Sequence, residues 1–240
     1  MKLFKKPFHF ELFDKSGKLI YQDLRERAFE KDQIGRLSHF SKVDREFDHF
    51  YGFGEKTGHL DKKGRRLRMS PKDAIGHDPE TGDPMYKHIP FYIRVNEHDL
   101  RPVGLFYHNS YDCVFDLGEE LSGYWERYCY YQTDGGDIDL FLLAGETLPE
   151  ILNEYTLLTG RSACPPSSLW ATALPPCTTP SWKRTATRRS TRSSISTKKR
   201  ASSSTTLAGF RLFQRRKGQP ALCVQLEQQA LPGAGKVLEN

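Results

Sequence analysis

The sequence predicts a mainly β protein, in which a β-sandwich is followed by one helix and then by a tail of different composition. Three observations support this prediction. Short aromatic segments with alternating apolar residues recur between turn residues up to residue 145, which is typical of sandwich strands. Apolar residues then recur at helical spacing, and after residue 161 the composition changes abruptly. A chain of 240 residues can form one medium domain with a tail.

The strands are expected from their period of two. In residues 8–13, FHFELF, the side chains of Phe8, Phe10 and Leu12 share one face. DKSG at 14–17 predicts a turn and KLIYQD a returning strand, so the two strands form a hairpin. Residues 22–48 are highly charged, and we expect a surface loop with short edge strands there. Six further strand segments follow: HFYGFGE, HIPFYIRV, VGLFYHN, YDCVFDL, YWERYCYYQ and DIDLFLLAG.

One helix is expected to start near Thr147 and to close the folded part. Thr147 and Glu150 form a capping-box pattern, and Gly160 stands where a helix C-terminus belongs. The apolar residues that fall on one face at helical spacing are Leu148, Ile151, Leu152, Tyr155 and Leu158.

The charge divides the chain at the same boundary. The net charge of +6 is the sum of −6 over residues 1–160 and +12 over residues 161–240. Every His, Tyr and Asp precedes residue 161, whereas the segment KRTATRRSTRSSISTKKR at 183–200 has no acidic residue. We therefore expect a folded domain over 1–161 and a disordered, basic tail over 162–240.

The cysteines and the N-terminus exclude several classes of protein. Five cysteines without close paired spacing indicate neither a disulfide framework nor a zinc site, and Cys113 and Cys129 are expected to be buried thiols. The N-terminus lacks the apolar core of a signal peptide, and no segment is long and apolar enough to span a membrane. We expect a soluble, cytoplasmic protein without membrane contact. GFGEKTG at 52–58 lacks the spacing of a phosphate-binding loop, so no cofactor is expected.

A long polar segment at 56–87 is expected to be either a functional loop or a solvated surface loop. Its Asp, His and Arg residues suit hydroxylated ligands. Asp73, His77 and Asp78 match no metal-ligand spacing, so no metal site is expected. No nucleophile with a positioned base can be assembled, and no catalytic residue is predicted in this chain. The residues alone indicate a soluble β-rich domain with one polar loop.

Four stretches resemble glycoside hydrolase family 31, the α-glucosidases and their relatives. They are FYGFGEKTGHLDKKGRRLRM, KDAIGHDPETGDPMYKHIPFYI, GLFYHNSYDCVFDLG and GGDIDLFLLAGETLPEILNEYTLLTGR. The resemblance spans about Phe8 to Arg161 and implies a galactose-mutarotase-like β-sandwich that precedes a catalytic (β/α)₈ barrel. It also implies retaining hydrolysis of terminal α-linked glucosyl units by two barrel carboxylates. This chain is expected to lack that barrel.

The resemblance implies a substrate contact from the polar loop. An Asp of that loop contacts sugar hydroxyls in the family, and the matching residue is Asp73 in MSPKDA, with His77 as a weaker candidate. The implied partner is an α-glucoside or oligosaccharide, bound weakly. Loss of the barrel would leave an apolar face exposed, so self-association through that face is expected.

The tail departs from the family after TGRSACPP. Codons permitted for Trp170 to Thr179, read from the third letter, give GYCASTMYY, which resembles a family barrel entry. Residues from about Ser167 to Asn240 are therefore expected to be a frameshifted translation of barrel-coding DNA. The leading hypothesis is a truncated, inactive α-glucosidase fragment. The alternatives are a stand-alone carbohydrate-binding module and, third, a nucleic-acid-binding tail, although no groove-reading motif indicates a specific nucleic acid.

Overall fold

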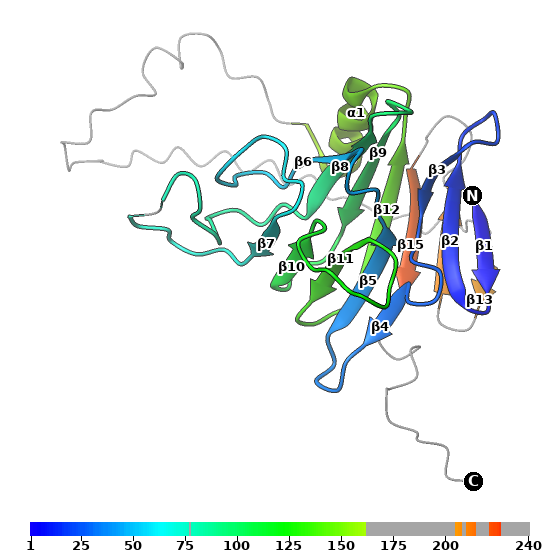
Figure 1. Cartoon of the computed structure of the whole chain (residues 1–240), viewed down its shortest axis with the longest axis horizontal. Helices are drawn as coiled ribbons and strands as arrows, with labels where there is room; N and C mark the ends of the chain where they lie inside the picture. The colour runs from blue at the N-terminus through cyan, green and yellow to red at the C-terminus, as the bar shows by residue number, and fades with distance from the viewer. Residues whose placement is uncertain (77, 162–204, 208–209, 215–220, 227–240) are drawn as a thin grey trace, which may run out of the picture.

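The fold is taken from a computed structural model, which describes residues 1–76, 78–161, 205–207, 210–214 and 221–226. Its strands form three antiparallel sheets, and one helix packs against them (Figure 1). The prediction of a mainly β sandwich with one helix is confirmed. The elements are β1 (Lys2–Lys5), β2 (Phe8–Phe13), β3 (Leu19–Gln22), β4 (Phe29–Lys31), β5 (Leu37–Lys42), β6 (Asp48–Gly52), β7 (Arg66–Met69), β8 (Phe91–Asn96), β9 (Pro102–Tyr107), β10 (Cys113–Asp116), β11 (Tyr128–Thr133), β12 (Ile138–Ala144), α1 (Leu148–Thr159), β13 (Thr205–Leu207), β14 (Phe210–Gln214) and β15 (Ala221–Leu226).

Two of the sheets face each other across the main core. One has the order β4-β5-β11-β10-β7 and the other the order β13-β14-β15-β12-β9-β8-β6. Tyr107 of β9 stacks on Tyr131 of β11 with ring centroids 3.9 Å apart, and Phe115 of β10 contacts both rings. These aromatic residues are buried, so the alternating strands of the sequence contribute their apolar faces to a single core.

The third sheet, in the order β1-β2-β3, contains the predicted hairpin. Phe10, Leu12 and Tyr21 belong to the same buried cluster as the residues between the two large sheets. The small sheet therefore extends the main core.

Strand β5 corrects the prediction of a surface loop with edge strands over residues 22–48. It lies between β4 and β11, and most of its polar side chains are buried. Each of them has a specific partner: His39 contacts Asp23 and Tyr107, Ser38 accepts a hydrogen bond from Gln132, and Ser41 contacts Cys129. Hydrogen bonds offset the desolvation of these buried polar groups. The polar sequence of the strand does not reveal that they are buried.

Helix α1 lies against the outer face of the seven-stranded sheet, near β8, β9 and β12 (Figure 1). Its buried residue Ile151 packs in a cluster with Phe91 and Leu143, and Tyr155 stacks on Phe91 at 3.8 Å. The predicted apolar face is only partly correct, because Leu148 and Leu152 are 42% and 48% exposed.

The helix ends differ in part from the predicted capping box. The Thr147 side chain makes no capping hydrogen bond; instead a Glu150 oxygen accepts the Glu146 N–H at 2.8 Å. Gly160 ends the helix as expected, with φ 104° and its N–H donated to the Thr156 carbonyl at 2.9 Å. The carboxylate thus satisfies the backbone N–H of the residue that precedes the N-cap.

Three segments of the tail, β13, β14 and β15, lie in the seven-stranded sheet. Strand β15 pairs antiparallel with β12, and β14 and β13 continue the sheet. The physical reason is that an edge strand presents unpaired N–H and C=O groups, which any extended segment can satisfy. The rest of the expected tail lies outside the described residues. Within the described chain, no helix is long and apolar enough to span a membrane.

Candidate functional site: the polar loop

The polar segment between β6 and β8 is fixed at its base by a buried lysine. The Lys56 side chain is 1% exposed, and its ammonium group donates to the Asp83 carboxylate and to the Arg68 carbonyl oxygen. Asp83 also accepts the backbone N–H of Arg68 in β7, and the Thr57 hydroxyl donates to the Gly82 carbonyl at 2.6 Å. These bonds join the two ends of the segment, so it is an ordered excursion from the sandwich.

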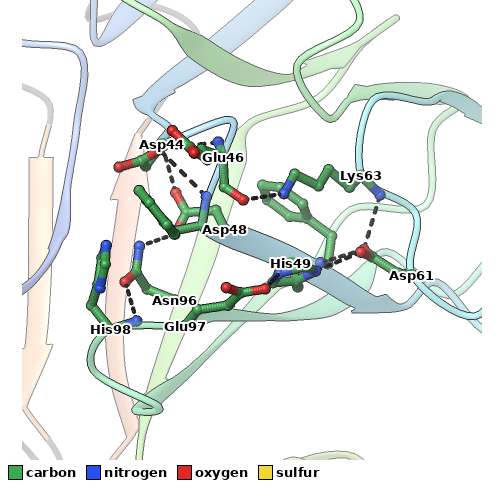
Figure 2. A network of polar contacts seen from close by, with 11 residues as sticks. Asp44, Glu46, Asp48, His49, Asp61, Lys63, Asn96, Glu97 and His98 are labelled. Carbon is green, nitrogen blue, oxygen red and sulfur yellow. Dashed lines mark hydrogen bonds and ion pairs between the residues drawn. The ribbon is translucent and has the colours of Figure 1, made fainter.

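The first half of the segment is held by the Asp61 carboxylate (Figure 2). One oxygen accepts the backbone N–H groups of Phe50 and Lys63, each at 3.0 Å, and the other contacts His49 Nδ1 at 2.6 Å. Desolvation by itself raises the pKa of Asp61, but these hydrogen bonds outweigh it and lower the pKa. The carboxylate therefore stays ionised while it anchors the loop to β6.

His49 lies between two carboxylates (Figure 2). Its Nε2 contacts Glu97 at 2.7 Å, opposite the contact with Asp61. The hydrogen bond with Asp61 raises the pKa of His49 most, burial opposes this, and Glu97 adds to the increase. The imidazolium form therefore joins β6, the polar loop and the turn between β8 and β9.

The second half of the segment starts at β7, which pairs with β10. The Ser70 hydroxyl donates to the Asp112 carboxylate at 2.6 Å. The Arg68 guanidinium lies 3.1 Å from Asp134 and 3.5 Å from Asp112. The chain therefore leaves the sheet at Ser70 in a fixed direction.

Asp73, the predicted ligand residue, follows this anchor and is exposed. Its carboxylate lies close to the Tyr86 phenol on the returning arm. Desolvation and then the adjacent Asp73 charge raise the pKa of Tyr86. The Lys72 N–H donates to the Met85 carbonyl at 3.3 Å and closes the two arms beside this pair. The structure thus presents a carboxylate and a phenol together at the loop surface, while His77 lies outside the described residues.

A pocket of about 560 Å³ lies where the polar segment rejoins the sheet. Asp73 is not among the residues that line it. His88 Nε2 contacts the Tyr111 carbonyl at 2.9 Å, and His108 Nδ1 contacts Asp139 at 3.3 Å. Tyr111 is 56% exposed. The walls therefore combine aromatic rings with imidazole and carboxylate groups, as small-molecule sites commonly do. The lining comprises His88, Ile89, Pro90, Phe106, Tyr107, His108, Asn109, Ser110, Tyr111, Gly136, Asp137, Asp139 and Tyr155.

A second cluster of titratable groups, Asp23, His39 and Tyr107, lies in the interior. All three residues are at most 2% exposed. Because their side chains are buried in the core, we assign the cluster a structural role. Among the described residues, no group of three or more His, Cys, Asp or Glu side chains could hold a metal ion. The predicted buried thiols are confirmed, and burial raises the pKa of Cys113 to about 12.

The fold and the loop place the protein in a class, the galactose mutarotase-like β-sandwiches. The particular family follows from residues 1–116, which match the glycosyl hydrolase 31 N-terminal galactose mutarotase-like domain. The resemblance seen in the sequence is thereby confirmed over this part of the chain.

The chain is also similar in sequence to curated α-glucosidases and to an α-xylosidase. The chain is 38% identical over 168 residues to α-glucosidase 2 of Bacillus thermoamyloliquefaciens, covering 70% of this chain and 20% of the relative. It is 32% identical over 124 residues to an α-glucosidase of Saccharolobus solfataricus, with 52% and 17% covered. An α-xylosidase of Lactiplantibacillus pentosus is 32% identical over 126 residues, with 51% and 15% covered. The chain thus spans about a fifth or less of these relatives.

Solved structures agree on the fold. A dextranase of this family from Flavobacterium johnsoniae is 30% identical, with a TM-score of 0.59, and the match covers 66% of this chain and 18% of that one. An α-1,4-glucan lyase of Gracilariopsis lemaneiformis has a TM-score of 0.52 at 18% identity, with 64% and 19% covered, and shows the fold alone.

Proposed function

We propose that this chain is the carbohydrate-contacting accessory part of an α-glucosidase-type glycoside hydrolase, without the two catalytic carboxylates. The observation that carries the proposal is the anchored loop, which presents Asp73 beside Tyr86 at its surface. A carboxylate next to a phenol accepts and donates hydrogen bonds to vicinal sugar hydroxyls. Retaining hydrolysis requires two carboxyl groups that flank the scissile bond about 5–5.5 Å apart. The relatives extend well beyond the part of their chains that matches this one.

Two measurements test this proposal. The purified chain should not turn over an α-glucosyl chromogenic substrate. In an NMR titration with isomaltose and maltose, the signals of the loop should shift, and Asp73→Ala should abolish the shift. Glu80→Ala is the matched control, because Glu80 is also an exposed carboxylate of the same loop. Turnover that survives in purified protein, or equal titrations for both variants, would contradict the proposal.

A stand-alone carbohydrate-binding module is the second candidate. The observation that favours it is the pocket of about 560 Å³, which needs no second domain to form its walls. Tyr111 offers an exposed ring on which the apolar face of a sugar could stack. Under this candidate, Tyr111→Ala would weaken saccharide binding more than Asp73→Ala. The two variants therefore separate the two functions.

We infer for the tail that residues from about Ser167 onward result from a shift of reading frame. The charge change from −6 to +12 between the two parts supports this inference, as do the permitted codons that restore family-like segments. Sequencing the coding DNA around the codons for Ser167 and Thr206 tests it. Intact frames at both places would overturn the inference.

A further inference from the structure

The edge of β12 that faces away from β9, called here its outer edge, pairs with a distant part of the chain. Strand β12 pairs on one side with β9 and on the other with β15, which lies far along the sequence. In Figure 1, β15 lies beside β12, on the side away from β9. Some backbone groups of β12 therefore pair only with this second neighbour.

The alternation of the β12 backbone identifies these groups. The Asp139 carbonyl accepts the His108 N–H at 2.8 Å, on the β9 side. Successive residues of a strand direct their N–H and C=O groups to opposite sides. Asp139, Phe141 and Leu143 therefore face β9, whereas the backbone groups of Ile138, Leu140 and Leu142 face β15. Without a neighbour on the β15 side, the N–H and C=O groups of Leu140 and Leu142 would form an unpaired strand edge, which favours pairing with another extended segment.

We propose that the outer edge of β12 is a strand-accepting surface for extended peptide segments, and that the chain's own segment Ala221–Leu226 occupies it as an exchangeable plug. The register pairs Leu140 with Val224 and Leu142 with Leu222. Main-chain pairing supplies the recognition, so the segment can close the edge even if its sequence comes from a shifted reading frame. The proposal concerns a different surface from the sugar-contacting loop and does not rest on the proposed function.

The long connection between β12 and β15 allows the β15 segment to be exchanged for another one. Helix α1 ends at Thr159 and β13 starts at Thr205, so β15 is tied to β12 only through a long stretch of chain. A long connection gives a modest effective concentration. A segment of the same sequence from outside can therefore compete with the internal one, including the segment of a second copy of this chain.

The first test is a cross-link in the full chain. Phe141 and Cys223 are opposite each other, in a pair without mutual hydrogen bonds, where Cα atoms approach to about 4.5 Å. This separation is within disulfide range. Mild oxidation of Phe141→Cys should give an internal cross-link to Cys223, which Cys223→Ser removes. A dimer linked through the same two cysteines also supports the strand-accepting edge. Equal cross-linking with and without Cys223 would overturn the proposal.

The second test is hydrogen exchange in the full chain. Val224→Pro removes the N–H that is directed at Leu140 and bars the segment from pairing, whereas Val224→Thr keeps this N–H. We expect the amides of Leu140 and Leu142 to exchange at least about tenfold faster in Val224→Pro than in Val224→Thr. The amides of Phe141 and Leu143, which face β9, should change little and also report that the variant is folded. Equal exchange of Leu140 and Leu142 in the two variants would overturn the proposal.

An added peptide tests exchangeability in the same variant. A synthetic peptide of residues 219–228, QPALCVQLEQ, should restore slow exchange at Leu140 and Leu142 when it is added to Val224→Pro. A peptide with the same sequence but proline in place of Val224 is the control. If neither peptide slows the exchange, the edge does not accept strands in trans and the proposed exchange is wrong.

Discussion

The Asp23 carboxylate contacts the His39 imidazole in the interior of the sandwich, with Oδ1 2.9 Å from Nε2, and both side chains are fully buried. The second Asp23 oxygen accepts the Phe10 N–H, and His39 Nδ1 lies 2.8 Å from the Tyr107 hydroxyl. Three sheets therefore meet in one chain of hydrogen bonds. Burial raises the pKa of Asp23, and the contact with His39 opposes this increase.

Loss of the contact between Asp23 and His39 should destabilise the fold. His39→Leu leaves the Asp23 carboxylate without the imidazole, and we expect a loss of about 3–5 kcal/mol in the free energy of unfolding. The control is His108→Leu, which removes the exposed contact with Asp139 and should cost less than about 1 kcal/mol. Urea unfolding followed by fluorescence measures both. A cost for His39→Leu no larger than that of His108→Leu would show that the buried chain does not stabilise the fold.

The pH dependence of stability should reflect His49. Since the folded-state pKa of His49 is raised, its contacts stabilise the fold fully below the unfolded pKa of about 6.5. This contribution decreases as the pH rises through the folded-state pKa. The stability difference between the wild type and His49→Gln should therefore be larger at about pH 5.5 than at about pH 8.5. The exposed residue His59 gives a control in His59→Gln. A difference that grows with pH would contradict the ion-pair arrangement.

Helix α1 should be sensitive to Gly104 in β9. A Cβ atom there would lie 2.6 Å from Ile151 Cγ2 and 3.1 Å from Leu143 Cβ. Gly104→Ala should therefore cost about 1–3 kcal/mol through overpacking. Gly123→Ala is the control, because no heavy atom lies within 4 Å of the added methyl group. Thermal unfolding compares the two variants.

A second substitution shows whether this cost comes from the helix. In the Ile151→Ala background the tightest contact, with Ile151 Cγ2, is removed, so adding Gly104→Ala should cost less than it does in the wild type. Equal costs in both backgrounds would place the strain elsewhere.

The base of the polar loop should depend on Lys56. Lys56→Met fills the same space but leaves Asp83 and the Arg68 carbonyl without the ammonium group. We expect faster proteolysis within residues 70–90 and faster exchange of the Arg68 amide, because local opening becomes easier. Lys72→Met, at an exposed position of the same loop, should leave both rates unchanged. Equal proteolysis of the two variants would exclude Lys56 as the anchor.

The sequence predicts the aromatic strands well but not β5 and β7. FHFELF and DIDLFLLAG alternate clearly, and β2 and β12 lie within them. LSHFSK is polar, and its burial depends on partners from distant strands, which periodicity cannot reveal. RLRM does alternate arginine with buried Leu67 and Met69, but it is only four residues long and lies inside a polar segment. Intrinsic β preference is weak compared with this tertiary context.

The candidate site was only partly accessible from the sequence. The resemblance led to Asp73, whose sugar contact stays a prediction. The anchors were missed because Lys56 and Asp83 are separated by 27 positions, and Ser70 and Asp112 by 42. A lysine and an aspartate so far apart carry no local signal, and the length of the polar segment left a functional loop and a solvated surface loop both open.

The anchored base of the polar loop has a thermodynamic consequence for recognition. A flexible segment must be ordered when a ligand binds, and the entropy lost then weakens the affinity. Here the contacts of Lys56, Asp61 and Asp83 order the loop when the protein folds, before any ligand binds. Under the proposed function, a sugar at the Asp73 carboxylate would therefore meet a largely preformed arm, and its hydrogen bonds would contribute directly to affinity.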